Sequence, residues 1–105
     1  MKNKHLKNLL ITIIIAIALP IFYALVYKLI TFYTSDAFVG LASGDSFIHF
    51  LYFSFITITT TGHGDIYPIS GLAKAIVATE ILIGIVLVSL LVYFNVLRIK
   101  SKNKS

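Results

Sequence analysis

The sequence contains no cysteine, a single arginine and only four acidic residues among its 105 positions. Without cysteine, a disulfide framework, a cysteine zinc site and thiol chemistry are excluded. With one arginine, the arginine ladder of a voltage sensor is excluded as well. Hydrophobic residues instead make up 58% of the chain, a share typical of membrane proteins rather than of soluble domains. The length fits one small domain spanning residues 1–105, and no internal repeat divides it.

The positive charges lie at the two ends of the chain. The net charge is +5, and seven of the nine cations fall within residues 2–7 or 98–104. Clusters that flank apolar runs indicate cytoplasmic loops under the positive-inside rule rather than a nucleic-acid partner. Both termini are therefore predicted to be cytoplasmic, which requires an even number of membrane crossings, and the basic ends are predicted to contact anionic lipid.

Two apolar runs are long enough to cross a bilayer. Residues 9–29 would cover roughly 31 Å as a helix, and residues 72–97 about 39 Å. Pro20 is expected to bend the first helix near its middle. The A-x-A pattern at 16–18 also fits a signal peptide, but the apolar run continues eleven residues further than cleavage would need. The sequence predicts two transmembrane helices and a polar, basic tail at 98–105 that is frayed.

The segment between the two runs is nearly neutral and rich in turn residues and aromatic residues. Residues 30–45 are predicted to form an extracellular loop. Residues 46–59 would form a helix of roughly 20 Å, too short to span, so a re-entrant helix is predicted. The alternation at 56–59 also fits a strand, and that alternative rests on local pattern alone.

A threonine run followed by Gly-His-Gly-Asp occupies positions 59–65. Two glycines one residue apart allow backbone dihedrals that turn carbonyl groups in one direction. Such irregular backbone survives at membrane depth only when protein covers it or when it lines a watery cavity. Residues 60–64 resemble the selectivity filter of the potassium channel superfamily, usually Thr-Val-Gly-Tyr-Gly, and the Gly-Asp-Ile-Tyr-Pro that ends at Pro68 is also typical of that family.

The resemblance to two-transmembrane, one-pore-loop potassium channels covers roughly residues 9–98. It implies an all-α membrane protein with two transmembrane helices, a re-entrant pore helix and an extended filter. In the family, carbonyl oxygens of the filter replace the hydration shell of the ion. The resemblance implies K⁺ sites formed by Thr60, Thr61, Gly62 and His63, with Gly64 completing the filter. One loop supplies one oxygen per layer, so it also implies a homotetramer in the cell membrane, with no cofactor and no enzymatic activity.

The filter and its surroundings depart from the family pattern at several positions. Thr61 and His63 replace valine and tyrosine, and imidazole, unlike phenol, gains a proton at an ordinary pKa of about 6.5. Tyr52 and Phe53 stand where the family carries a tryptophan pair that supports the filter. The Tyr52 hydroxyl is expected to bond Asp65, and Phe53 is expected to face His63.

The second transmembrane helix contains three features of interest. The resemblance makes Gly84 a gating hinge, and a small residue for close helix packing is an equally good interpretation. Glu80 is an acid within an apolar run and is expected to face protein or water, most simply by bonding hydroxyls or backbone behind the short helix. Three-to-four residue spacing and the family geometry suggest an apolar cavity lining. Its candidate residues are Ile85, Val88, Val92 and Val96.

Two further functions fit the same sequence. Because Thr61 and His63 depart from the usual filter, a weakly selective channel that also admits Na⁺ is one alternative. A membrane hairpin that joins a larger complex without conducting is the other. A catalytic site built from the threonines, His63 and Asp65 is disfavoured, since adjacency in sequence implies no general-base geometry.

Overall fold

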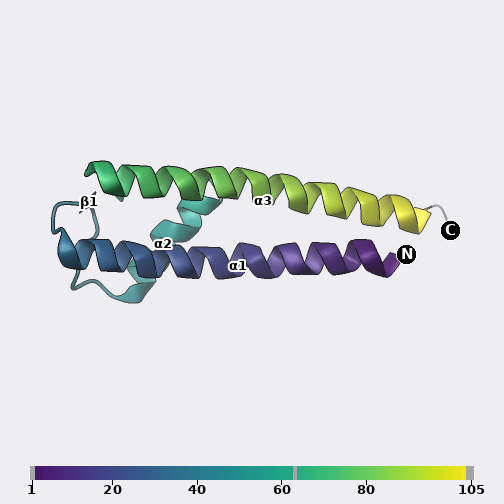
Figure 1. The fold of residues 1–105 in the computed structure, drawn as a ribbon, viewed down its shortest axis with the longest axis horizontal. Helices are drawn as coiled ribbons and strands as arrows, with labels where there is room; N and C mark the ends of the chain where they lie inside the picture. The colour runs from purple at the N-terminus through teal and green to yellow at the C-terminus, as the bar shows by residue number, and fades with distance from the viewer. Residues whose placement is uncertain (1, 63, 104–105) are drawn as a thin grey trace.

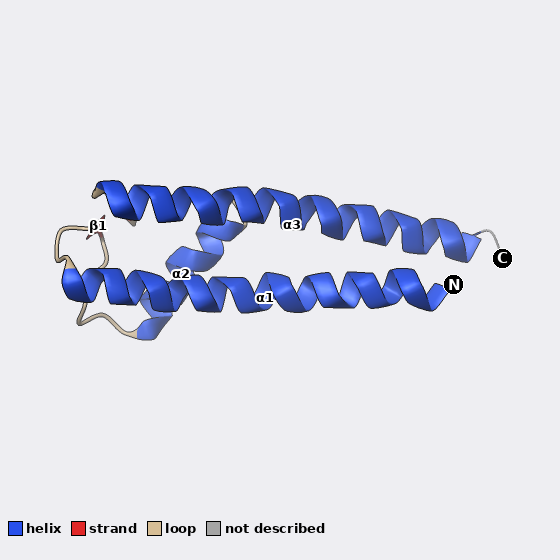
Figure 2. Cartoon of the chain, in the orientation of Figure 1, coloured by secondary structure: helices blue, strands red, loops and turns tan. Residues whose placement is uncertain are grey.

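The computed structural model describes residues 2–62 and 64–103. Two long antiparallel helices, α1 (Lys2–Tyr33) and α3 (Gly71–Asn103), form a hairpin, and the short helix α2 (Phe47–Ile58) lies between them (Figure 1). Both termini lie at the same end of this hairpin. Two short strands, β1 (Phe38–Val39) and β2 (Tyr67–Pro68), are placed in the connecting loops (Figure 2). The predicted order of two transmembrane helices around a short helix is confirmed.

The long helices extend further than the sequence predicted. The first was expected to end at 29, but α1 continues to Tyr33, so the outer loop begins later than residue 30. The basic tail at 98–105 was expected to fray, but α3 remains helical to Asn103. The change from apolar to basic residues does not end a helix, because lysine and arginine are good helix formers and favour a helix C-terminus. The chain is also helical through Pro20, so this residue does not divide α1.

The core lies in the half of the hairpin away from the termini. There α2 packs between the long helices. Each long helix buries one stripe of side chains that recur every three to four residues. On α3 this stripe includes Ala73, Val77, Glu80, Gly84 and Leu87. On α1 it runs from Pro20 to Thr31 and includes Tyr23, Ala24, Tyr27 and Ile30. Small residues in both stripes let helix backbones approach closely, as is usual for membrane helices.

The outer loops are fastened to each other by a short antiparallel pairing. Phe38 pairs with Pro68 and Val39 with Tyr67. The Ile69 amide donates to the Ala37 carbonyl at 2.8 Å. Gly40 has a φ of +88°, and a Cβ there would lie 2.6 Å from the Asp65 carbonyl oxygen. This loop therefore approaches the segment that follows residue 64 as closely as only glycine allows.

Candidate functional site: the pore loop

The loop after α2 begins as a helix cap. The Thr61 amide donates to the Ile56 carbonyl at 2.9 Å, and the Thr60 amide donates to the Thr57 carbonyl at 3.0 Å. This pair of bonds is a Schellman motif, which requires a left-handed residue at the position Thr60 occupies. Thr60 has a φ of 59° and is the only non-glycine with positive φ in the described chain. A β-branched residue there costs about 1–2 kcal/mol, a strain typical of functional loops.

Every second residue of the loop has positive φ: 59° at Thr60, 55° at Gly62 and 85° at Gly64. At residues 60–62, where Thr61 lies between two residues of positive φ, this change of backbone handedness gathers amide groups on one side of the chain and leaves the carbonyl groups facing away from them. The Gly62 amide joins the Thr61 amide on the Ile56 carbonyl, at 3.2 Å. Within the described ranges 2–62 and 64–103, the carbonyl oxygens of Thr60, Thr61 and Gly62 accept no hydrogen bond. These carbonyl oxygens are therefore available to coordinate a cation.

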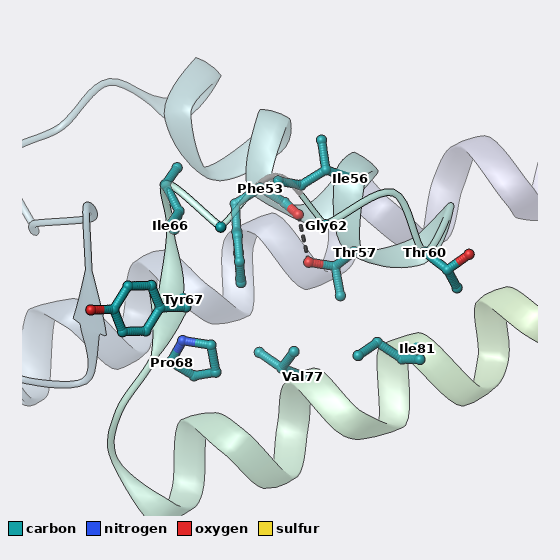
Figure 3. Close-up of a pocket in the computed structure, with 11 residues that line it drawn as sticks. Phe53, Ile56, Thr57, Thr60, Gly62, Ile66, Tyr67, Pro68, Val77 and Ile81 are labelled. Carbon is teal, nitrogen blue, oxygen red and sulfur yellow. Dashed lines mark hydrogen bonds between the residues drawn. The ribbon is translucent and has the colours of Figure 1, made fainter.

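An apolar pocket of about 410 Å³ lies between this loop and α3. In Figure 3, α2 contributes Phe53 and Thr57 from one side, and α3 contributes Val77 and Ile81 from the other. The Thr57 hydroxyl has no proton left to donate into the pocket, because it donates to the Phe53 carbonyl of its own helix at 2.7 Å. The pocket is a space for apolar groups rather than an ion site.

Two of the predicted supporting residues lie on α2 and behave differently. The Tyr52 hydroxyl donates to Oδ2 of Asp65 at 3.3 Å, the contact expected from the sequence. Desolvation, the negative charge of Asp65 and this hydrogen bond raise the pKa of the Tyr52 hydroxyl above its ordinary value. The hydroxyl therefore stays a donor into alkaline solution. The bond joins α2 to the residue that follows the predicted filter.

Phe53 belongs to a buried aromatic cluster that the sequence did not reveal. Its ring centroid lies 5.2 Å from that of Tyr27 and 5.4 Å from that of Phe38, both edge to face. Tyr27 and Phe38 complete the triangle at 5.5 Å. Such pairs contribute about 0.5–1.5 kcal/mol each beyond their burial. The expected contact partner His63 lies outside the described residues, as does its predicted ion-binding carbonyl.

Glu80 is fully buried where the three helices meet. The Tyr27 hydroxyl of α1 donates to its Oε1 at 2.6 Å. The Ser54 hydroxyl of α2 lies 2.6 Å from its Oε2 and 2.7 Å from the Pro20 carbonyl oxygen. The carboxyl group thus bonds hydroxyls behind the short helix, the arrangement that the sequence analysis preferred. It lies behind α2 and not at the loop of residues 60–64.

Comparison with protein families identifies the class to which this loop belongs. A model of the family described as "Ion channel" matches residues 10–99, most of the chain. The chain belongs to this ion channel family. Neither the curated proteins nor the solved structures include a match. The protein is therefore a two-transmembrane ion channel that conducts ions passively, and its family points away from an enzyme. Its two long helices are both long and apolar enough to cross a membrane.

Gly84 of the channel is a contact point between α3 and the end of α2. A Cβ at this position would overlap the Ile58 carbonyl oxygen, whereas a Cβ at Gly71 would meet nothing within 4 Å. The contact accounts for the glycine through close packing, and the hinge role inferred from the resemblance stays a prediction. Any substitution here displaces the last turn of α2 or α3 itself.

The four candidate cavity-lining residues all lie on α3 C-terminal to Gly84, and all four are exposed within one chain. Ile81, on the same face, and Leu82 and Val86, on a neighbouring face of α3, are exposed too. Exposure in a single chain therefore does not distinguish a cavity face from a lipid face. The assignment of Ile85, Val88, Val92 and Val96 to the cavity stays a prediction.

Tyr27 and Ser54 are the site residues that the sequence analysis missed. A partial signal for them existed, because a buried acid in an apolar run needs hydrogen-bond donors. The sequence could not say which hydroxyls would meet Glu80, since they lie 53 and 26 residues away from it along the chain.

Proposed function

We propose that the channel conducts K⁺ through a ring of carbonyl oxygens supplied by residues 60–63. The observation that carries the proposal is the positive φ at Thr60, Gly62 and Gly64, with the amides of residues 60–62 bonded back to α2. An ion entering a narrow pore loses its water, and several carbonyl oxygens at fixed distance replace that water. The partial negative charge at the C-terminus of α2 favours a cation beside the loop.

A single loop cannot surround an ion, so the proposed pore is a homotetramer. Its support is the apolar surface that one chain leaves uncovered. In an 18-residue apolar stretch of each long helix, only 22% is buried within the chain. Neighbouring copies and lipid would cover the remainder. Cross-linking in mild detergent should rise to four chains and stop, and a conducting monomer or dimer would contradict the proposal.

The proposed topology places both ends in the cytoplasm of a cell membrane. Its support is that both termini lie at one end of the hairpin and carry most of the cations (Figure 1). The acids Asp36, Asp45 and Asp65 all belong to the opposite end. Anionic lipid at the cytoplasmic leaflet would meet the basic ends. A reporter fused to either terminus should be accessible only from inside the cell.

The experiment that tests conduction is cation flux into liposomes that contain the purified channel alone. Gly64→Ala is the informative variant, because φ at residue 64 is 85° and an added Cβ would strain a backbone that has open space around it. Gly44→Ala in the outer loop is the matched control, since it also has open space but no positive φ. We expect K⁺ flux in the wild type and control, and its loss in Gly64→Ala. No flux from the wild type would favour the non-conducting hairpin.

The weakly selective channel remains the second candidate, and Thr61 is the observation that favours it. In the family this position usually holds an apolar valine, and here an exposed hydroxyl lies 2.8 Å from the Thr59 hydroxyl. A polar pair beside the carbonyl groups offers additional oxygen ligands. Equal Na⁺ and K⁺ flux that becomes K⁺-selective in Thr61→Val would support this candidate.

A further inference from the structure

One buried carboxyl group connects all three helices of the channel. Glu80 of α3 is 0% exposed, and its two oxygens contact hydroxyls from different helices. Oε1 accepts from Tyr27 of α1, and Oε2 lies 2.6 Å from Ser54 of α2. Ser54 is also 0% exposed and reaches back to Pro20 of α1.

Counting protons around Ser54 shows that one is missing if Glu80 is ionised. A serine hydroxyl has one proton to donate. The Pro20 carbonyl oxygen, 2.7 Å away, carries no proton and must accept one. The contact with Oε2 is equally short at 2.6 Å, and a single proton shared between the two would point fully at neither. A second proton supplied by the carboxyl group satisfies both contacts.

The surroundings also disfavour an ionised carboxylate. The titratable groups that face Glu80 are Tyr27 and, next to it, Tyr23 of α1, whose hydroxyl contacts Thr79 at 2.9 Å. From α2 only the Ser54 hydroxyl faces it. No cation in the described part of the chain forms an ion pair with Glu80, and Lys28 lies instead over the Phe50 ring, 6.0 Å from its centroid. An unpaired buried charge in a membrane segment is costly.

We propose that Glu80 is a neutral carboxylic acid that donates a hydrogen bond to Ser54, and that the chain Tyr27–Glu80–Ser54–Pro20 positions the pore helix and its loop. Tyr27 donates to Oε1, the proton on Oε2 goes to Ser54, and Ser54 donates to Pro20. Every member then has its partner. Such fully satisfied buried networks fix one arrangement of the elements that they join.

The network acts on the loop through α2. Ser54 lies two residues before Ile56, whose carbonyl accepts the amides of both Thr61 and Gly62. A shift of this turn of α2 would move that carbonyl and, with it, the start of the loop. Glu80 is therefore a positioning residue for the ion path. This second step rests on the proposed function, whereas the protonation state does not.

Infrared difference spectroscopy of the purified channel against Glu80→Gln tests the protonation state directly. The sequence has only four acidic residues, and Asp36 and Asp65 are exposed while Asp45 is half-buried. We expect the carbonyl stretch of a protonated carboxyl group at neutral pH in the wild type and its disappearance in Glu80→Gln. A difference spectrum that shows only carboxylate bands would overturn the proposal.

The positioning role is tested by comparing Glu80→Gln with Glu80→Ala. Glutamine offers an amide donor to Ser54 and a carbonyl to Tyr27, so it should retain most of the thermal stability and the cation selectivity. Alanine offers neither, and both should fall; Tyr27→Phe, which removes one hydroxyl from the same network, should give a smaller loss. Equal loss in glutamine and alanine variants would overturn the role. A non-selective wild type would instead refute the proposed function and leave the infrared result standing.

Discussion

The two halves of the hairpin are held together in different ways. In the half that contains α2, which the proposed topology makes the outer half, α2 fills the space between the long helices, and Tyr27, Phe53, Ser54 and Glu80 are buried within one chain. In the other half, which the proposed topology makes the inner half, Thr12 is the only buried residue of α1 before Pro20 in the described sequence, and α3 buries none there after Leu87. The outer half is packed by contacts within one chain, whereas the inner half presents apolar surface that lipid or other copies must cover.

This difference separates two tasks of the channel. The proposed ion path is set by contacts made inside each chain, since the amides that begin the loop of residues 60–64 donate to carbonyl groups in the last turn of α2. The inner half buries few side chains within one chain, so lipid or other copies supply most of its neighbours. Substitutions in the outer half should therefore affect folding and selectivity, and those in the inner half should affect access to the pore.

The largest effect is expected from Gly84→Ala. The added Cβ would overlap the Ile58 carbonyl oxygen, so α2 or α3 must move. We expect a loss of about 3 kcal/mol or more in stability, seen as early thermal unfolding and as loss of the assembled channel in detergent. Gly71→Ala, at an open position of the same helix, is the control. A stable Gly84→Ala channel with altered gating alone would support the hinge instead.

The inner half is tested by single cysteines, which are unambiguous because the chain has none of its own. Val92 and Leu82 are similarly exposed in one chain, at 59% and 65%. If α3 lines the cavity as predicted, a thiol reagent from the cytoplasm should block current through Val92→Cys when the pore is open and leave Leu82→Cys unaffected. Similar block of both variants would show that the cavity face is misassigned.

A smaller effect separates buried from exposed hydroxyls. Ser54 bonds across helices in the outer half, while Ser89 is exposed on α3 and donates to its own helix at the Ile85 carbonyl. Ser54→Ala leaves buried partners unsatisfied and should cost about 1–3 kcal/mol. Ser89→Ala should cost about 0.5 kcal/mol or less. Thermal unfolding in one detergent measures both, and equal losses would remove the distinction between the halves.

Much of the fold was readable from the sequence because its determinants are local. Helix number and order follow from the length of apolar runs, and the left-handed backbone after α2 follows in part from glycines at 62 and 64. The helix ends were predicted too early, because the polarity change at residue 98 coincides with no helix breaker. The partners of Glu80 and the contact of Gly84 with Ile58 depend on tertiary packing, which no periodicity encodes.

The smallest expected effect concerns the loop itself and rests on the sequence alone. His63 lies outside the described residues, and an imidazole there can gain a proton that tyrosine cannot. Four such charges around the path would repel a cation even when partly screened. We expect external acid to lower conductance, and His63→Tyr to remove this response and sharpen K⁺ over Na⁺ selection. The same acid response in both proteins would assign His63 to packing.

Residues 60–63 of four chains are proposed to form a K⁺-selective path. The most direct measurement is the reversal potential of purified channels in a planar bilayer with K⁺ on one side and Na⁺ on the other. We expect a reversal potential displaced strongly toward the K⁺ equilibrium value. A steady conductance that reverses near zero would contradict selectivity, and the absence of any conductance would contradict the proposed ion path.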